Sequence, residues 1–199
     1  MKMFFNLSMM AFLTIGLLTG CQSPPVNSAA KKMATQSMRN NGYSLLHQLL
    51  DQEKNVALLR FIRPEEADVK QLMKKIAATS GAGATLLEKF AQDDPTIRLD
   101  DIRLPPAEMA TREAIGATKK KELLNQSGDT FELTLLLTQT EALSYASHLA
   151  KVTGENEPQP DRARALAGIS EDMQNLYHEV FGLLLAKTKS SATNSTQPD

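Results

Sequence analysis

Apolar residues recur at helical spacing along most of the chain between residues 42 and 187. Their period is close to 3.6 residues, and no alternating apolar and polar run bounded by turn residues interrupts it. The pattern predicts five helices, at about Gly42–Ile62, Pro64–Gln92, Ala107–Leu124, Asp129–Thr153 and Asp161–Lys187. The sequence therefore predicts an all-α protein.

Several local signals set the expected ends of these helices. Pro64 and the acidic residues that follow it suit a first helical turn. Asp129, with Glu132 three positions later, resembles a capping box and predicts a new helix there. A single kinked helix over residues 106–153 is the alternative to two separate helices. Gly81 and Gly83, in the middle of the second helix, predict a kink or a close helix contact.

The lengths of the connections suggest how the helices are arranged. The first two helices and the last two form hairpins with short turns, and a connection of roughly 35 residues, which contains the remaining helix, joins the hairpins. This order is typical of a four-helix bundle with the ferritin-like arrangement, and an up-down bundle with an extra helix is the runner-up. Because helix 129–153 is apolar nearly all round, we expect the crossover helix or a second subunit to cover its outer residues, Leu133 and Leu137.

The N-terminus has the three parts of a secretory signal. A positive charge at Lys2 precedes an apolar stretch from Phe4 to Leu18, and the small residues Thr19 and Gly20 follow. The stretch contains polar residues and falls short of the about 20 apolar residues that span a bilayer. The sequence therefore predicts a signal peptide over residues 1–20.

Cys21, the only cysteine of the chain, directly follows this signal. Leu18-Thr19-Gly20-Cys21 resembles the lipobox of bacterial lipoprotein precursors, which implies that Cys21 is acylated and becomes the mature N-terminus. Lipoproteins of this family carry several acyl chains, which the resemblance implies here too, because one chain alone would anchor the protein to a membrane only marginally. In that family an Asp after the Cys favours the inner membrane. Because Gln22 stands there, we expect the periplasmic side of the outer membrane, with the inner membrane as the alternative.

Composition divides the remaining chain. Residues 21–40 are rich in Ser, Pro, Ala, Asn and Lys and predict a flexible, lipidated tether. Residues 41–188 form the expected helical domain, and residues 189–199 a disordered tail. Removal of residues 1–20 leaves 21 basic and 23 acidic residues. The remaining chain therefore has no evident basic face, which nucleic-acid binding needs.

The predicted ferritin-like arrangement raises the question of a di-metal carboxylate site. Such a site needs a Glu from each of two helices and a Glu-x-x-His pair from each of the other two. The residues three positions before the histidines are Ser44 for His47, Tyr145 for His148 and Asn175 for His178. The ligand spacing of that family is therefore missing.

A metal site of another kind would have to draw on the remaining polar residues of the helices. The candidates are Glu53, Glu141, His148 and His178. In a hairpin of the last two helices, His148 and His178 lie roughly 18 Å apart along the axis, too far to share a metal. Boundary residues in hydrogen bonds or ion pairs are the plainer interpretation.

Motifs for catalysis are missing from the sequence as well. Residues 80–83, Ser-Gly-Ala-Gly, lie within a helix and are too short for a phosphate-binding loop, and Gly-x-Ser-x-Gly is absent. The stretch 131–139 is similar to uncharacterised bacterial envelope proteins built as helical bundles, a resemblance that implies no activity. We therefore expect a lipid-anchored, non-catalytic envelope module without a cofactor, which binds an envelope protein or a second copy. The alternative is a degenerate ferritin-like binder of a metal or small molecule.

Overall fold

The computed structural model describes residues 28–61 and 66–194. The predicted signal peptide, Cys21, the first part of the predicted tether and the last five residues lie outside these ranges. The elements are α1 (Ser28–Glu53), a 3-10 helix η1 (Val56–Phe61), α2 (Ala67–Asp93), α3 (Pro106–Asn125), α4 (Gly128–Glu155) and α5 (Pro160–Asn194). Five α-helices and no strand occur in the described ranges, which confirms the predicted all-α class.

Helix α1 differs from its prediction at both ends. It begins at Ser28, so residues 28–40 are helical where a flexible tether is predicted. This segment is rich in Ala, Lys and Met, which favour helix, but it has no apolar stripe that would reveal a helix in the sequence. At the other end, the Asn55 amide donates to the Asp51 carbonyl at 3.0 Å, and the backbone tightens into η1. A side chain that bonds helix carbonyls in this way competes with regular α-helix.

The boundary between α3 and α4 confirms two helices instead of one kinked helix. Gln126 and Ser127 are extended, and Gly128 has a φ of 57°, a conformation that L side chains rarely adopt. The predicted capping box is wrong. Ser127 is the N-cap, and the Glu132 carboxylate accepts the backbone N–H of Glu66 at 2.5 Å, far away in sequence.

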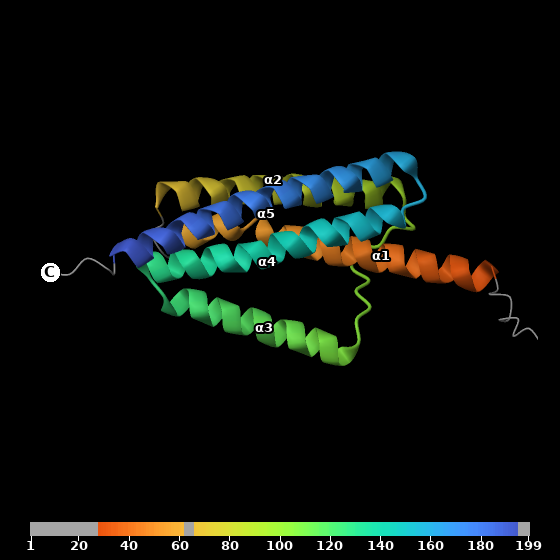
Figure 1. The fold of residues 1–199 in the computed structure, drawn as a ribbon. Coiled ribbons are helices and arrows are strands. Elements are labelled where there is room, and N and C mark those ends of the chain that lie inside the picture. Colours follow the sequence, from red (N-terminus) through yellow and green to blue (C-terminus); the bar gives the residue numbers. More distant parts are fainter. Residues whose placement is uncertain (1–27, 62–65, 195–199) are drawn as a thin grey trace, which may run out of the picture.

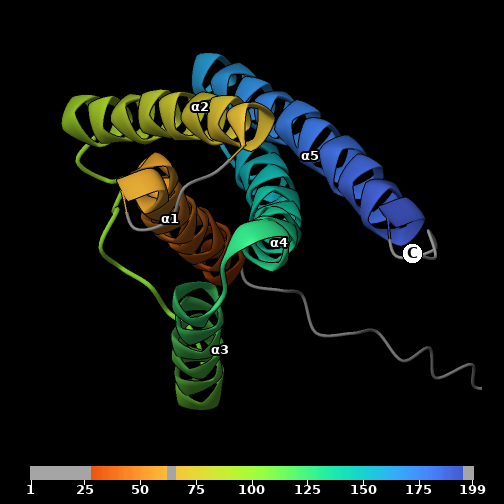
Figure 2. The same cartoon turned by 90° about the vertical axis from the view of Figure 1, so that its left-hand side faces the viewer.

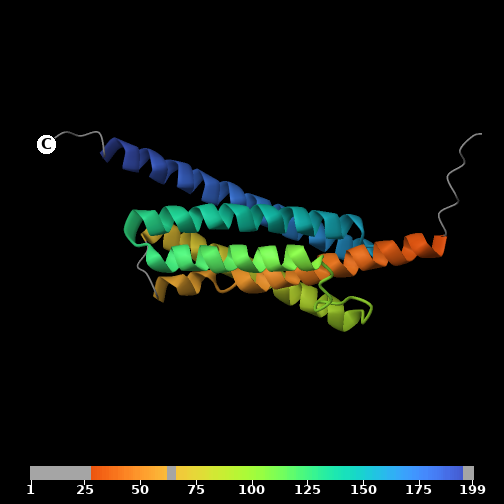
Figure 3. The ribbon, with the colours of Figure 1, turned by 90° about the horizontal axis from the view of Figure 1, so that it is seen from below.

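Successive helices run in opposite directions, and the whole is bundle-like (Figure 1). Helix α4 packs along α5, α1 packs against α2 and α4, and α2 contacts α5. The end view shows these helices fanning out, with α3 set apart from them (Figure 2). From below, α3 runs along the outside of the molecule (Figure 3). Helix α5 continues to Asn194, so residues 189–194 are helical where a disordered tail is predicted.

The core lies between α1, α2, α4 and α5. Its largest fully buried side chains are Tyr43, Leu46, Leu50, Met73, Ile76, Leu87, Phe131, Leu135, Leu136, Leu143, Leu166 and Met173. Every buried hydrophobic residue of the described chain lies between Tyr43 and Val180. Helix α3, which is described in full, has no buried residue. The fully buried core residues therefore lie outside α3 and outside the N-terminal half of α1, and Leu123 of α3 packs against them.

Tertiary contacts bury one face of helix α4 and leave other apolar residues of this helix exposed. Tyr145 and Val152 are 38% and 45% exposed, while the face with Leu136, Leu143 and Ala150 is buried. The crossover helix, α3, covers the outer residues of α4 only in part. Helix α3 lies beside α4, Leu133 is half-buried and Leu137 is 52% exposed.

Two glycines permit close helix approaches. A Cβ on Gly83 would lie 3.0 Å from Leu50 of α1 and 3.9 Å from Ile169 of α5. This confirms the predicted close contact in α2. A Cβ on Gly42 would clash with the Thr153 hydroxyl of α4. Glycine therefore sets how near α1 can approach α4.

Candidate functional site

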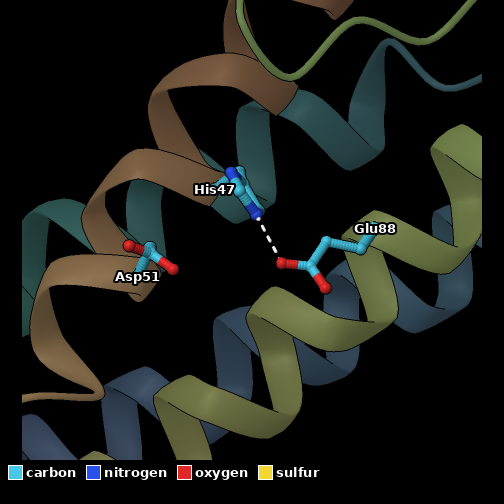
Figure 4. A group of neighbouring side chains, drawn as sticks. All are labelled: His47, Asp51 and Glu88. Atoms are coloured by element: carbon cyan, nitrogen blue, oxygen red, sulfur yellow. Dashed lines mark hydrogen bonds and ion pairs between the residues drawn. The ribbon is translucent and has the colours of Figure 1, made fainter.

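The strongest cluster of metal-ligating side chains lies between α1 and α2 (Figure 4). His47 and Asp51 are one helical turn apart on α1, so they share a face. Glu88 reaches them from α2, and its Oε1 lies 3.1 Å from His47 Nε2. One ligand atom from each residue lies within 4.8 Å of the others, and all three residues are half-buried.

A neighbouring lysine favours the charged form of Asp51 in this cluster. The Lys54 ammonium lies 2.5 Å from Asp51 Oδ1, and this hydrogen bond holds the pKa of the Asp51 carboxyl below its ordinary value. One imidazole nitrogen and two carboxylates suit a borderline divalent ion such as Zn²⁺. Bonds of about 2.1 Å in a tetrahedral site place ligand atoms about 3.4 Å apart, so the more distant atoms here would have to approach one another.

The sequence contained part of the signal for this cluster. The pairing of His47 with Asp51 at i and i+4 is visible in the sequence, but the expected ferritin-like spacing draws attention to i−3 instead. Glu88 is 41 residues from His47. Only the packing of α2 on α1 brings it into reach.

The four candidate metal residues of the sequence are not brought together. Glu141 is exposed and pairs with Lys119 of α3. His148 is exposed, with its Nδ1 2.8 Å from the Ser144 carbonyl, and His178 is exposed. Within residues 28–61 and 66–194, the one group of three metal-ligating side chains close enough to share an ion is His47, Asp51 and Glu88. None of the four candidates belongs to this group.

Glu53, the fourth candidate, lines a cavity of about 450 Å³ between α1, α3 and α4. Its Oε2 is buried and has no hydrogen-bond partner among the described atoms. Burial raises the pKa of the Glu53 carboxyl above its ordinary value, and a hydrogen bond with the Gln139 side chain offsets part of this increase. Glu53 therefore faces a ligand-sized space without a charge partner.

A buried polar network closes the end of the molecule where α4 turns into α5. The Tyr43 hydroxyl donates to Glu157 Oε2 at 2.8 Å, and Arg162 lies 2.9 Å from Glu157 Oε1 and 3.0 Å from Asp94. Because the Glu157 side chain is completely buried and both its oxygens have partners, its charge is compensated. The network joins α1, the connection after α2 and the α4–α5 turn. Its role is structural.

A basic cavity of about 550 Å³ borders this network. The N-terminal half of α1 contributes Lys31, Lys32 and Arg39, and Thr96 and Pro158 close the other side. Arg39 Nη2 donates to Thr96 Oγ1 at 3.0 Å, which fixes the buried guanidinium. The cavity therefore presents positive charge at the end of the chain that follows the predicted lipidation site.

Comparisons of the chain with protein-family models, curated proteins and solved structures found no significant match. In the part of the chain that the structure describes, no helix is both long enough and apolar enough to pass through a bilayer.

Proposed function

We propose that this chain is a lipid-anchored, non-catalytic helical module on the periplasmic side of the outer membrane. The proposal rests on the lipobox-like Leu18–Cys21 after an apolar stretch and on Gln22 in the sorting position. Its core would form a four-helix bundle of α1, α2, α4 and α5 with a ferritin-like chain order. Neighbouring helix contacts among these four elements are compatible with that arrangement.

The single observation that carries the proposal is the projection of α1. Its N-terminal half extends past the ends of α4 and α5 on the side from which the chain enters (Figure 1). Lys31 and Lys32 are exposed there. From Cys21 the chain can reach the start of α1 over at most about 25 Å. Near an anionic surface each such basic residue contributes about 1 kcal/mol of attraction, so this end suits a position beside lipid head groups.

A protein partner from the envelope or a second copy would bind exposed apolar side chains of α3 and α4. Helix α4 exposes Leu137, Tyr145 and Val152, and α3 exposes Ile115. Apolar side chains gathered on neighbouring helices are typical of interaction surfaces. They favour an association role for this face.

The anchor is tested by expressing Cys21→Ser and Gln22→Asp chains in a bacterial host. Cys21→Ser should lose incorporation of labelled fatty acid. Gln22→Asp should keep the label and move from outer-membrane to inner-membrane fractions. Equal labelling of the Cys21→Ser chain and the parent would refute the lipid anchor, whereas unchanged sorting of Gln22→Asp would refute only the outer-membrane assignment.

A second candidate function is divalent metal binding at His47, Asp51 and Glu88, because these residues converge from two helices. Purified protein would be titrated with Zn²⁺ and with Mn²⁺, and bound metal would be counted. His47→Gln should reduce Zn²⁺ affinity tenfold or more, while His148→Gln, at an exposed position outside the cluster, should leave it unchanged. Equal effects of the two substitutions would contradict a site at His47.

A further inference from the structure

The cavity beneath α3 combines apolar walls with two polar atoms that lack partners. Val56, Leu123 and Phe131 contribute apolar surface, and Glu53 and Gln139 add polar groups. At about 450 Å³, the cavity is within the range of small-molecule sites. It is separate from the His47 cluster and from the basic cavity, with which it shares no lining residue.

The two polar groups are unsatisfied at the wall of this cavity. Among the described atoms, neither Glu53 Oε2 nor Gln139 Oε1 has a hydrogen-bond partner, although both are buried. The whole Gln139 residue is only 3% exposed. A buried polar group left without a partner costs about 1–3 kcal/mol, so a bound group that supplies a hydrogen bond would be stabilised here.

Helix α3 forms the outer wall and is held by Leu123, which packs against the core, and by polar contacts. Arg112 Nη2 donates to the Tyr145 hydroxyl at 2.9 Å, and Lys119 pairs with Glu141. These contacts are solvent-exposed, and exposed pairs contribute little to stability. Because α3 contributes no fully buried side chain, this helix can move away from α4 at a smaller cost than a helix of the core. A molecule can therefore enter the cavity without disrupting the core.

We infer that this cavity binds a neutral, apolar molecule that carries a hydroxyl group. The hydroxyl would lie between Glu53 and Gln139, and the apolar body would lie against Leu123 and Phe131. A hydroxyl has one donor and two acceptor positions, so it can donate to the Gln139 carbonyl oxygen while it accepts from a protonated Glu53. Beside an ionised Glu53 it can donate to only one of the two oxygens.

Charge at the cavity argues against two other head groups. Lys119 and Lys120 line it, which disfavours an ammonium head group. A carboxylate head group would meet Glu53 and Gln139, whose unpartnered oxygens are acceptors when Glu53 is ionised. The inference depends neither on the lipid anchor nor on metal binding.

The test uses the chain expressed from residue 22, which retains every described buried residue. Binding of 1-octanol, octane, octylamine and octanoate would be compared by ligand-detected NMR. We expect 1-octanol to bind at least tenfold more tightly than each of the others. No binding of 1-octanol would overturn the inference, and so would equal or tighter binding of octane, octylamine or octanoate.

Two matched glycine substitutions locate the binding. Gly116 lines the cavity, and a Cβ there would have no neighbouring atom within 4 Å, so Gly116→Leu would fill the space without a backbone clash. Gly182→Leu on α5 is the control, because its Cβ also has open space and it lies outside the cavity. Gly116→Leu should abolish 1-octanol binding, and Gly182→Leu should preserve it. Binding that persists in the Gly116→Leu chain would contradict the assigned cavity.

The hydroxyl preference is tested separately with Glu53→Leu. This substitution removes one of the two unsatisfied groups and leaves the apolar wall. The ratio of 1-octanol to octane affinity should fall tenfold or more, while octane binding should stay equal or improve. A ratio that does not change would show that Glu53 does not receive the hydroxyl. Circular dichroism would verify that each variant keeps its helices.

Discussion

The Glu132 carboxylate of α4 lies 2.7 Å from the Lys187 ammonium of α5, in a pair that closes one end of the molecule. Glu132 also accepts the Glu66 backbone N–H at the start of α2. Burial alone would lower the pKa of Lys187, but its hydrogen bonds to Glu132 and Glu66 raise it above the ordinary value. Its stabilising contribution is therefore complete below the unfolded pKa and is lost only in strong alkali, as pH rises through the folded pKa.

Removal of this ammonium should be costly. Lys187→Met leaves the buried Glu132 charge without its cation, and the free energy of unfolding should fall by about 3–5 kcal/mol. Lys75→Met is the matched control, because Lys75 forms an exposed pair with Glu179 and should change stability by less than about 1 kcal/mol. Urea denaturation measures both. Adding Glu132→Gln to Lys187→Met should recover part of the loss, and no recovery would contradict the buried-charge explanation.

Tyr43 should resist ionisation until the protein unfolds. Burial and the hydrogen bond to Glu157 raise the pKa of the Tyr43 hydroxyl above its ordinary value. The folded state therefore loses stability as pH rises above the unfolded pKa, because only the unfolded chain releases this proton readily. An alkaline absorbance titration should show a late tyrosine step that coincides with loss of helix. Tyr43→Phe should remove that step and Tyr177→Phe should keep it.

The close approach of α1 and α4 at Gly42 should not tolerate a methyl group. Thr153 is fixed there, because its hydroxyl donates to the Leu149 carbonyl at 2.7 Å. Gly42→Ala should destabilise the protein by about 1–3 kcal/mol in thermal or urea unfolding. Gly116→Ala, in open space on α3, should stabilise by up to about 1 kcal/mol. If the clash is the cause, Thr153→Ala should reduce the penalty of Gly42→Ala.

Stability should depend on pH through Glu53. Because burial raises its folded pKa, the carboxyl penalises the folded state as pH rises from the ordinary value of 4.5 through the folded pKa. Glu53→Gln removes this titration. We compare the unfolding free energy of Glu53→Gln minus that of wild type at two pH values. This difference should be about 1–3 kcal/mol larger at pH 7 than at pH 4, which is the cost of an unsatisfied buried group. Glu122→Gln, an exposed charge change on α3, is the control. A difference independent of pH would contradict a buried, titrating Glu53.

The candidate sites were predictable only in part. Glu53 is identifiable in the sequence as an acidic residue within an apolar helix, and its place at a cavity wall agrees with that choice. Its expected partner Glu141 instead pairs with Lys119 on the exposed side of α4. Gln139 lies two residues earlier on the opposite, buried side of α4, and no sequence signal separates these two positions. A helix apolar nearly all round does not reveal which face its neighbours will cover.

The sequence by itself determined the all-α class and most helix boundaries, because periodicity, proline and turn residues act locally. Tertiary structure decided which face of α4 is buried, the pairing of Glu132 with Lys187 and the meeting of His47 with Glu88. These relationships join residues distant along the chain. Their distances depend on how the helices pack, and that packing is set by the fit of whole helix surfaces, which no local pattern encodes.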